Sequence, residues 1–212
     1  MAGIEAPAAP SVETTDVLVP GAVLLASCGT PGPIGATHLA RRFAMRHHRP
    51  LNATTLMHVS SPGRIADAAT RSGAALIVLN VRHGTVDRLV DLELASSVIR
   101  RTSVPVLVVA PGPTQSMQSL VIASDGGPAS SYVAHLARAL GSDDASVRLL
   151  RGAACHTAYD IASTYEADLV AIDTNSRGCL ETPILQTIAD SLVWNARCSV
   201  LVVPPAHGEA VA

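Results

Sequence analysis

The segments VLLASCG (residues 23–29) and LVIASDG (residues 120–126) decide the fold, because they are two copies of one pattern 97 positions apart. Each is a short aliphatic run that ends in a polar residue and a glycine, which is typical of a buried strand leading into a turn. The motif HLAR follows at the same spacing, at residues 38–41 and 135–138. Matches in the same order indicate an internal duplication.

The duplication continues toward the end of each half. AALIVLN at residues 74–80 matches ADLVAID at residues 167–173, and VLVV at 106–109 matches VLVV at 200–203. The offsets have drifted to 93 and 94 residues, so insertions and deletions fall between the apolar runs. Loops accept such length changes more readily than strands do. We therefore expect two domains with the same element order.

In each half, aliphatic runs alternate with segments of helical periodicity. This pattern predicts parallel strands with right-handed crossovers and helices on both faces of the sheet. Strands are expected at residues 23–27, 54–59, 75–79 and 105–109, and again at 120–124, 146–150, 169–172 and 199–203. The expected organisation is a flexible tail (1–18), domain 1 (19–112), a linker (113–118), domain 2 (119–205) and a C-terminal tail (206–212).

Composition excludes several classes of protein. The net charge of -2 and an aromatic content of 2% argue against nucleic-acid binding, which needs basic surface and stacking platforms. No run of apolar residues is long enough for a membrane span, and the N-terminus lacks the basic start of a signal peptide. The four cysteines form no C-x-x-C pair and no zinc-like spacing. We expect a cytoplasmic protein without a metal site.

The stretch ADLVAIDTNSRGCLETPILQTIADSLVWNARCSVLVVP (residues 167–204) resembles the signature of the universal stress protein family. LVIASDGGPASS (residues 120–131) is similar to the family's first strand and turn. The resemblance implies two tandem, doubly wound, Rossmann-like domains of the adenine nucleotide alpha hydrolase type. It also implies that their last strands pair, giving an intramolecular pseudo-dimer. Family domains have five strands, but residues 50–74 leave room for only one strand and one helix, so we expect four strands in each half.

The family's nucleotide loop, Gly-x2-Gly-x9-Gly-Ser/Thr, is degenerate in this chain. The second half has Asp173-x2-Ser176-x9-Gln186-Thr187, with the spacing kept and the glycines replaced. Glycines let backbone amides approach phosphate, whereas a carboxylate repels it. The first half has Asn80-x2-His83. By resemblance, the candidate binding residues are Asp125, Gly126, Gly127, Asp173, Ser176 and Thr187, at a degenerate site.

These observations favour a stress-response or regulatory protein that is not an enzyme, has lost the ability to bind ATP and acts through protein partners. The alternative is a sensor that binds ATP or AMP at Asp125, Gly126 and Thr187 of the second half. A nucleotide hydrolase or transferase is a third hypothesis, which the lack of a basic phosphate clamp and an acid/base pair disfavours. No catalytic residue, nucleic acid or membrane partner is predicted, and a further homodimer stays open.

Three other features each allow two interpretations. The cationic run of residues 41–49 lies at the expected end of a helix, where it offsets the helix dipole, although an anion site is the rival. Cys28 ends a strand and is either a small buried residue or a reactive thiol. His38 and His135 occupy equivalent helix positions, which a shared structural role explains better than metal binding.

Overall fold

The computed structural model describes residues 21–28, 34–56, 61–82, 85–110, 117–124, 129–151, 163–164, 166–173 and 198–204. In the first half, these residues form β1 (Ala22–Cys28), α1 (Ile34–Arg46), β2 (Leu51–Leu56), α2 (Pro62–Arg71), β3 (Ala74–Asn80), α3 (Thr85–Ile99) and β4 (Val106–Val109). In the second half they form β5 (Ser119–Ser124), α4 (Ala129–Leu140), β6 (Ser146–Arg151), β7 (Leu169–Asp173) and β8 (Ser199–Val203).

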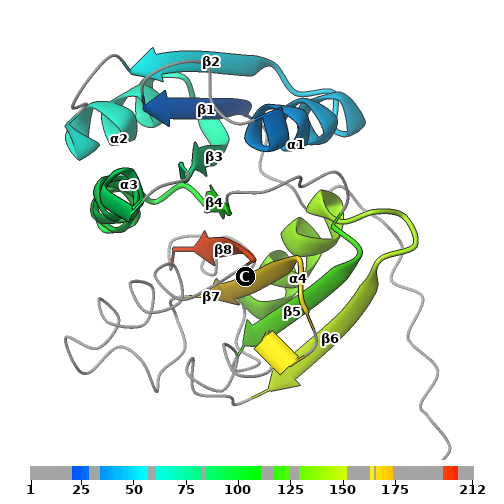
Figure 1. Cartoon of the computed structure of the whole chain (residues 1–212). Helices are drawn as coiled ribbons and strands as arrows, with labels where there is room; N and C mark the ends of the chain where they lie inside the picture. Colours follow the sequence, from blue (N-terminus) through cyan, green and yellow to red (C-terminus); the bar gives the residue numbers. More distant parts are fainter. Residues whose placement is uncertain are drawn as a thin grey trace, which may run out of the picture.

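The eight described strands form one continuous sheet, in the order β2-β1-β3-β4-β8-β7-β5-β6 (Figure 1). Neighbouring strands are parallel except at the centre, where β4 pairs with β8 in antiparallel orientation. The α/β fold with a mostly parallel sheet agrees with the prediction from the sequence. Each half contributes its strands in the same order from edge to centre, and β2 and β6 lie at the two ends of the order of the described strands.

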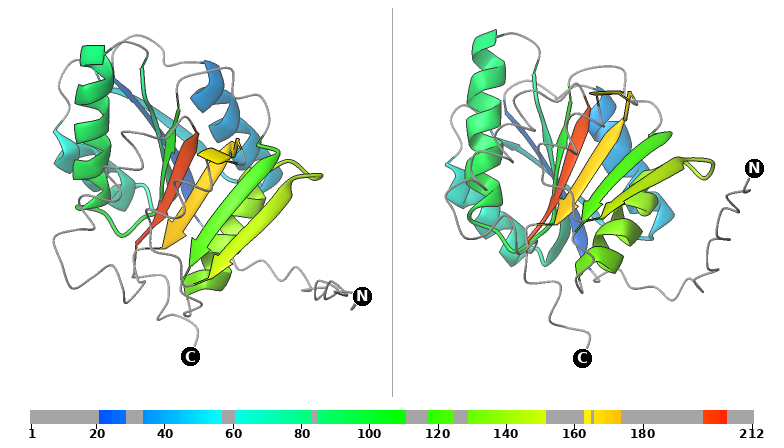
Figure 2. Two further views of the ribbon diagram at one scale, coloured as in Figure 1. Left: turned by 60° about the horizontal axis from the view of Figure 1, so that its bottom comes forward. Right: turned by 90° about the horizontal axis from the view of Figure 1, so that it is seen from below.

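Side chains alternate between the two faces of the sheet, so that each face has its own hydrophobic core. On one face, Leu24, Ile77 and Val108 pack with α2 and α3, through residues such as Ile65 and Leu92. On the other face, Val23, Val78 and Leu107 pack with α1 and α4, through residues such as Phe43 and Leu136. Figure 2 shows α3 on one side of the sheet and α1 with α4 on the other. Both cores extend across both halves of the chain.

The strand boundaries agree with the sequence-based prediction to within one residue at each end, except at β2. The sequence predicted a strand at residues 54–59, whereas β2 spans Leu51–Leu56. Its start is set by its neighbour, because Leu51 lies opposite Val23 and the carbonyl of Pro50 accepts a hydrogen bond from the Val23 amide. Among the described helices, none combines the length and hydropathy that crossing a bilayer requires.

Candidate functional site

The carboxyl ends of β1, β2 and β3 lie along one edge of the sheet, because these strands run parallel. In open α/β sheets, this edge is where ligands bind. Asn80 is the last residue of β3 and lies beside Val109, the last residue of β4. The candidate site of the first half is therefore built around the end of β3 and the segment that leads into α3.

An ion pair lies at the carboxyl ends of these strands, just after β3. Arg82 follows β3, and Asp91 lies in α3 with only 2% of its side chain exposed. The carboxylate of Asp91 accepts hydrogen bonds from the Arg82 backbone amide (2.8 Å), from Nε (3.0 Å) and from a terminal guanidinium nitrogen (3.0 Å). Charge-assisted, multiply bonded pairs of this kind are among the strongest side-chain contacts. The backbone amide of Arg82, two residues after the strand, is thus already bound to an anion within the chain.

Asn80 carries a buried amide beside this ion pair. The residue is 6% exposed, and neither its Oδ1 nor its Nδ2 has a hydrogen-bond partner among the described residues. A buried amide without partners raises the free energy of the folded state unless water or another polar group reaches it. The end of β3 can therefore accept one neutral polar group with a donor and an acceptor, and the guanidinium described beside it, that of Arg82, is already bound to Asp91.

The structure places only part of the predicted site of the second half. The backbone of Asp173 ends β7, in register with Val203 of β8, and occupies the position that corresponds to Asn80. Ser124 ends the adjacent parallel strand β5, so the chain leaves both strands at the same edge. Asp125, Gly126, Gly127, Ser176 and Thr187 lie outside the described residues. Their role as nucleotide ligands stays a prediction.

Asp168, which belongs to the signature-like stretch, acts at the opposite edge of the sheet. Its carboxylate accepts hydrogen bonds from the backbone amides of Gln118 (2.8 Å) and Ser119 (2.9 Å), at the start of β5. This contact holds the first strand of the second half against β7. The aspartate of the signature-like stretch therefore has a structural role that the sequence analysis did not identify.

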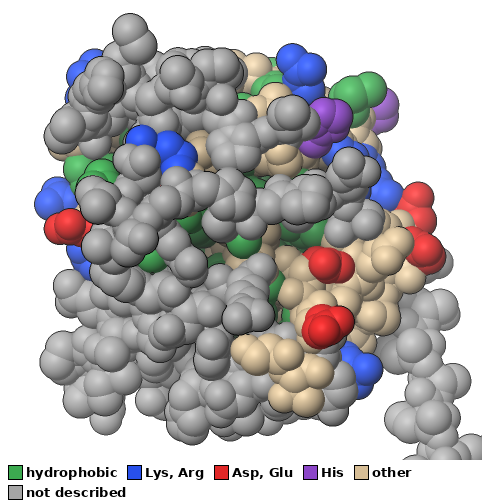
Figure 3. Space-filling model, in the orientation of Figure 1, with side chains coloured by type: hydrophobic (Ala, Val, Ile, Leu, Met, Phe, Trp, Pro, Cys, Tyr) green, Lys and Arg blue, Asp and Glu red, His purple; other side chains and the backbone are tan. Residues whose placement is uncertain are grey.

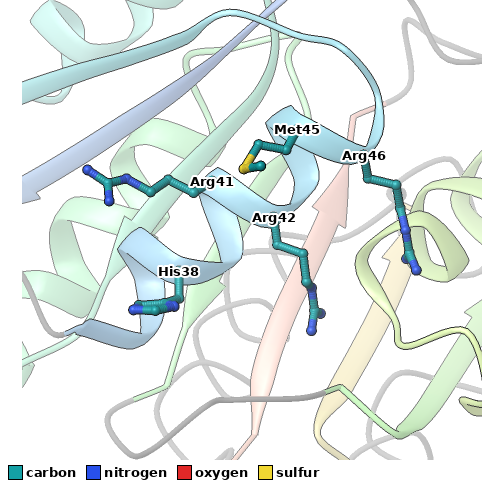
Figure 4. Close-up of a pocket in the computed structure, with 5 residues that line it drawn as sticks. All are labelled: His38, Arg41, Arg42, Met45 and Arg46. Carbon is teal, nitrogen blue, oxygen red and sulfur yellow. The ribbon is translucent and has the colours of Figure 1, made fainter.

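The cationic run of residues 41–49 contributes to a hollow on the outer side of α1. His38, Arg41, Arg42, Met45 and Arg46 line a hollow of about 630 Å³ (Figure 4). Arg42 and Arg46 point away from His38 and Arg41 in this view. Arg46 does lie in the last turn of α1, as the sequence predicted.

The contacts of these two arginines differ from the expected role at their own helix. Arg42 donates to the carbonyl of Leu140 (2.6 Å), and Arg46 donates to the carbonyl of Gly141 (2.8 Å). The two cations therefore bind the carboxyl end of α4, in the other half of the chain. Burial lowers the pKa of Arg42, and the nearby charge of Arg46 acts in the same direction. The sequence does not predict this contact, because nothing local in it marks which helix end the arginines reach.

The cysteines and histidines form no metal site among the described residues. Cys198 is half-buried and packs against the core beneath α2 and α3. Burial raises the pKa of its thiol to about 11, with the charge of Asp168 acting in the same direction. The side chain of Cys28 lies outside the described part of the chain, so its two interpretations stay open.

The fold is similar to that of solved universal stress proteins. A putative universal stress protein from Pseudomonas aeruginosa UCBPP-PA14 is similar with a TM-score of 0.55 and 14% identity, over 86% of this chain and 82% of that chain. A universal stress protein from Archaeoglobus fulgidus DSM 4304 is similar with a TM-score of 0.51 and 12% identity, over 80% of this chain and 76% of that chain.

A functionally unknown protein from Pseudomonas aeruginosa PAO1 has a TM-score of 0.50 and 14% identity, over 87% of this chain and 82% of that chain. No family profile and no curated protein matches the sequence. The fold therefore confirms the resemblance to universal stress proteins. At sequence identities this low, the similarity establishes the fold alone.

Proposed function

We propose that the chain is a stress-response or regulatory protein of the universal stress protein type, that it is not an enzyme, and that it acts through protein partners. In this proposal its two halves are degenerate domains that form an intramolecular pseudo-dimer and have lost the family's ATP site. The observation that carries the proposal is the ion pair between Arg82 and Asp91 at the end of β3.

Asp91 already accepts the hydrogen bonds that a phosphate bound at this position would need. Phosphate oxygens bind bare backbone amides at the start of a helix, which is why glycines precede such sites. Here the amide of Arg82 and its guanidinium both donate to Asp91. A triphosphate would have to displace a buried carboxylate from its cationic partner, and breaking such a pair is strongly unfavourable. The first half is therefore proposed not to bind nucleotide.

The second half is also proposed not to bind nucleotide, for a related reason. Asp173 ends β7 at the position equivalent to Asn80. A carboxylate at this position repels phosphate unless a cation lies between them. The competing proposal, an adenine-nucleotide sensor at Asp125, Gly126 and Thr187, requires the loops after β5 and β7 to overcome that repulsion.

The register of the central strands supports the pseudo-dimer. VLVV at residues 106–109 and VLVV at 200–203 are equivalent stretches, 94 residues apart. Leu107 lies opposite Leu201, which is its own equivalent, and Val106 lies opposite Val202. A two-fold contact brings equivalent positions together in this way. Pairing the two strands also removes two exposed apolar sheet edges.

Titration of the full chain with labelled ATP, with and without magnesium, tests the loss of nucleotide. We expect no saturable binding up to millimolar ATP, and no release of phosphate over the same range. Asp125→Ala is the matched variant. Saturable binding to the native chain that disappears in this variant would contradict the proposal and favour the sensor. Turnover of ATP by the native chain would contradict the non-enzymatic assignment.

A further inference from the structure

The contact between α1 and α4 joins positions that the duplication makes equivalent. The two HLAR motifs are 97 residues apart, and the same offset, continued past the motif, relates Arg46, the last residue of α1, to Asp143, which lies three residues beyond the end of α4. Arg46 and Asp143 form an ion pair, with 30% and 94% of their side chains exposed. They therefore lie near the approximate two-fold axis that relates the two halves, as Leu107 and Leu201 do in the sheet.

In a two-fold contact between identical surfaces, a residue near the axis faces its own copy. In this chain the two equivalent positions carry opposite charges. A contact between two first halves would place Arg46 opposite Arg46, and a contact between two second halves would place Asp143 opposite Asp143. Like charges that face each other are unfavourable. Only a first half against a second half brings opposite charges together.

The neighbouring contact has the same asymmetry. Arg42 donates to the carbonyl of Leu140, at the carboxyl end of α4, where the helix dipole is negative. The equivalent of Arg42 in the second half, at the offset of 97, is Ala139, which has no donor. Two second halves would thus lack the arginine that satisfies the helix end. Figure 3 shows basic side chains over α1 lying beside acidic side chains near the end of α4.

We propose that the unlike residues Arg42, Arg46 and Asp143 make the two halves selective for each other, so that the chain closes on itself and does not pair like halves between two molecules. This inference rests on the pseudo-dimer proposed above. It adds that the interface discriminates against the symmetric contacts that a duplicated sequence otherwise allows.

A charge-reversal cycle in the full chain tests whether the two positions face each other. We expect Arg46→Asp and Asp143→Arg each to lower the folding equilibrium constant by up to about fivefold at low salt, because each places like charges together. The double variant should recover the part of that loss that comes from like charges, though not the hydrogen bond from Arg46 to Gly141, and the recovered part should shrink in about 1 M salt. Arg41→Asp is the control, since it makes the same charge change on the exposed side of α1.

Mixing two charge variants tests the selectivity itself. In the Arg46→Asp chain both halves are acidic at this position, and in the Asp143→Arg chain both are basic. Unfolded together and refolded at low salt, differently tagged chains should give a 1:1 complex in native mass spectrometry. Neither variant alone should give that complex. A mixture of Arg46→Gln and Asp143→Asn chains, which carry no charge at these positions, is the control.

The two experiments separate the possible failures. Absence of coupling in the cycle would overturn the selectivity, but not the pseudo-dimer, which rests on the pairing of β4 with β8. Coupling without a mixed complex would leave the pseudo-dimer intact but overturn the selectivity. Exchange between two differently tagged native chains, as extensive as that between the variants, would overturn the selectivity as well.

Discussion

At the end of β3, the carboxylate of Asp91 accepts hydrogen bonds from the backbone and the side chain of Arg82. The pair lies nine residues apart in sequence, and neither residue belongs to a motif that predicts the other. Its effect is to join the segment after the strand to α3 and to neutralise the one buried carboxylate described at this edge. A side-chain contact of this kind can be identified only after the strand and the helix are placed.

Asp91→Ala should lower the free energy of unfolding by about 2–3 kcal/mol, because it removes the buried carboxylate that accepts hydrogen bonds from the guanidinium and the amide of Arg82. The estimate is at the low end for a buried pair, since Arg82 is 32% exposed. Urea unfolding at neutral pH measures the change. Glu93→Ala, an exposed acidic position on the same helix, is the control and should change the free energy of unfolding by less than about 0.5 kcal/mol. Equal effects of the two variants would contradict the role of the pair.

Cys198 provides a prediction about pH. Its thiol has a pKa raised to about 11 by burial, from an ordinary value of 9.0. Because the thiolate is the reactive form, alkylation near pH 8 should be about 100-fold slower in the folded chain than in unfolded chain. The raised pKa stabilises the fold below pH 9, and that contribution is lost as the pH rises through about 11. Peptide mass spectrometry after pulses of iodoacetamide, with and without urea, measures the rates. Similar rates in both conditions would contradict this prediction.

At the scale of elements, helix α1 does more than cover the sheet. Its buried face, with Leu39 and Phe43, packs on the core, as the helical spacing predicted. Its next face presents Arg42 and Arg46 to the end of α4, in the other half. The sequence placed these cations at the end of a helix but could not identify which helix end they satisfy, because that depends on how two distant elements pack.

Arg42→Ala should lower the free energy of unfolding by about 1–2 kcal/mol, because the carbonyl of Leu140 loses a charged donor and the stem of the arginine loses its packing. Arg41→Ala, at an exposed neighbouring position, removes the same charge without this contact and should change the free energy of unfolding by less than about 0.5 kcal/mol. Chemical denaturation of the two variants side by side provides the comparison. A larger loss for Arg41→Ala would show that net charge, rather than the contact with α4, matters.

At the scale of the whole molecule, one sheet and two cores run through both halves. β4 and β8 are flanked on both sides, and Leu107 and Leu201 are fully buried. Within the described part of the chain, the outer strands β2 and β6 each pair on one side. Because the halves share buried surface at the centre, we expect them to unfold together.

Leu107→Ala should lower the free energy of unfolding by about 2–5 kcal/mol and should reduce amide protection in β1 and β5 together. Hydrogen exchange followed by mass spectrometry measures both halves in one experiment. In the native chain, amides of β4 and β8 should exchange last and those of β2 and β6 first. Leu149→Ala, on the exposed face of edge strand β6, is the control with little expected effect. Loss of protection in the first half alone would indicate halves that unfold independently.

The sequence by itself determined that aliphatic runs alternate with helical segments in two matching halves, and therefore that the fold is α/β with a mostly parallel sheet. Local hydrophobic patterns are enough for this, because burial of alternating side chains specifies strands and helices. The start of β2, the pair of Arg82 with Asp91 and the contact of Arg42 with α4 were decided only by the tertiary structure. Each depends on which distant backbone and charged groups come within hydrogen-bond distance, and no spacing along the chain encodes that.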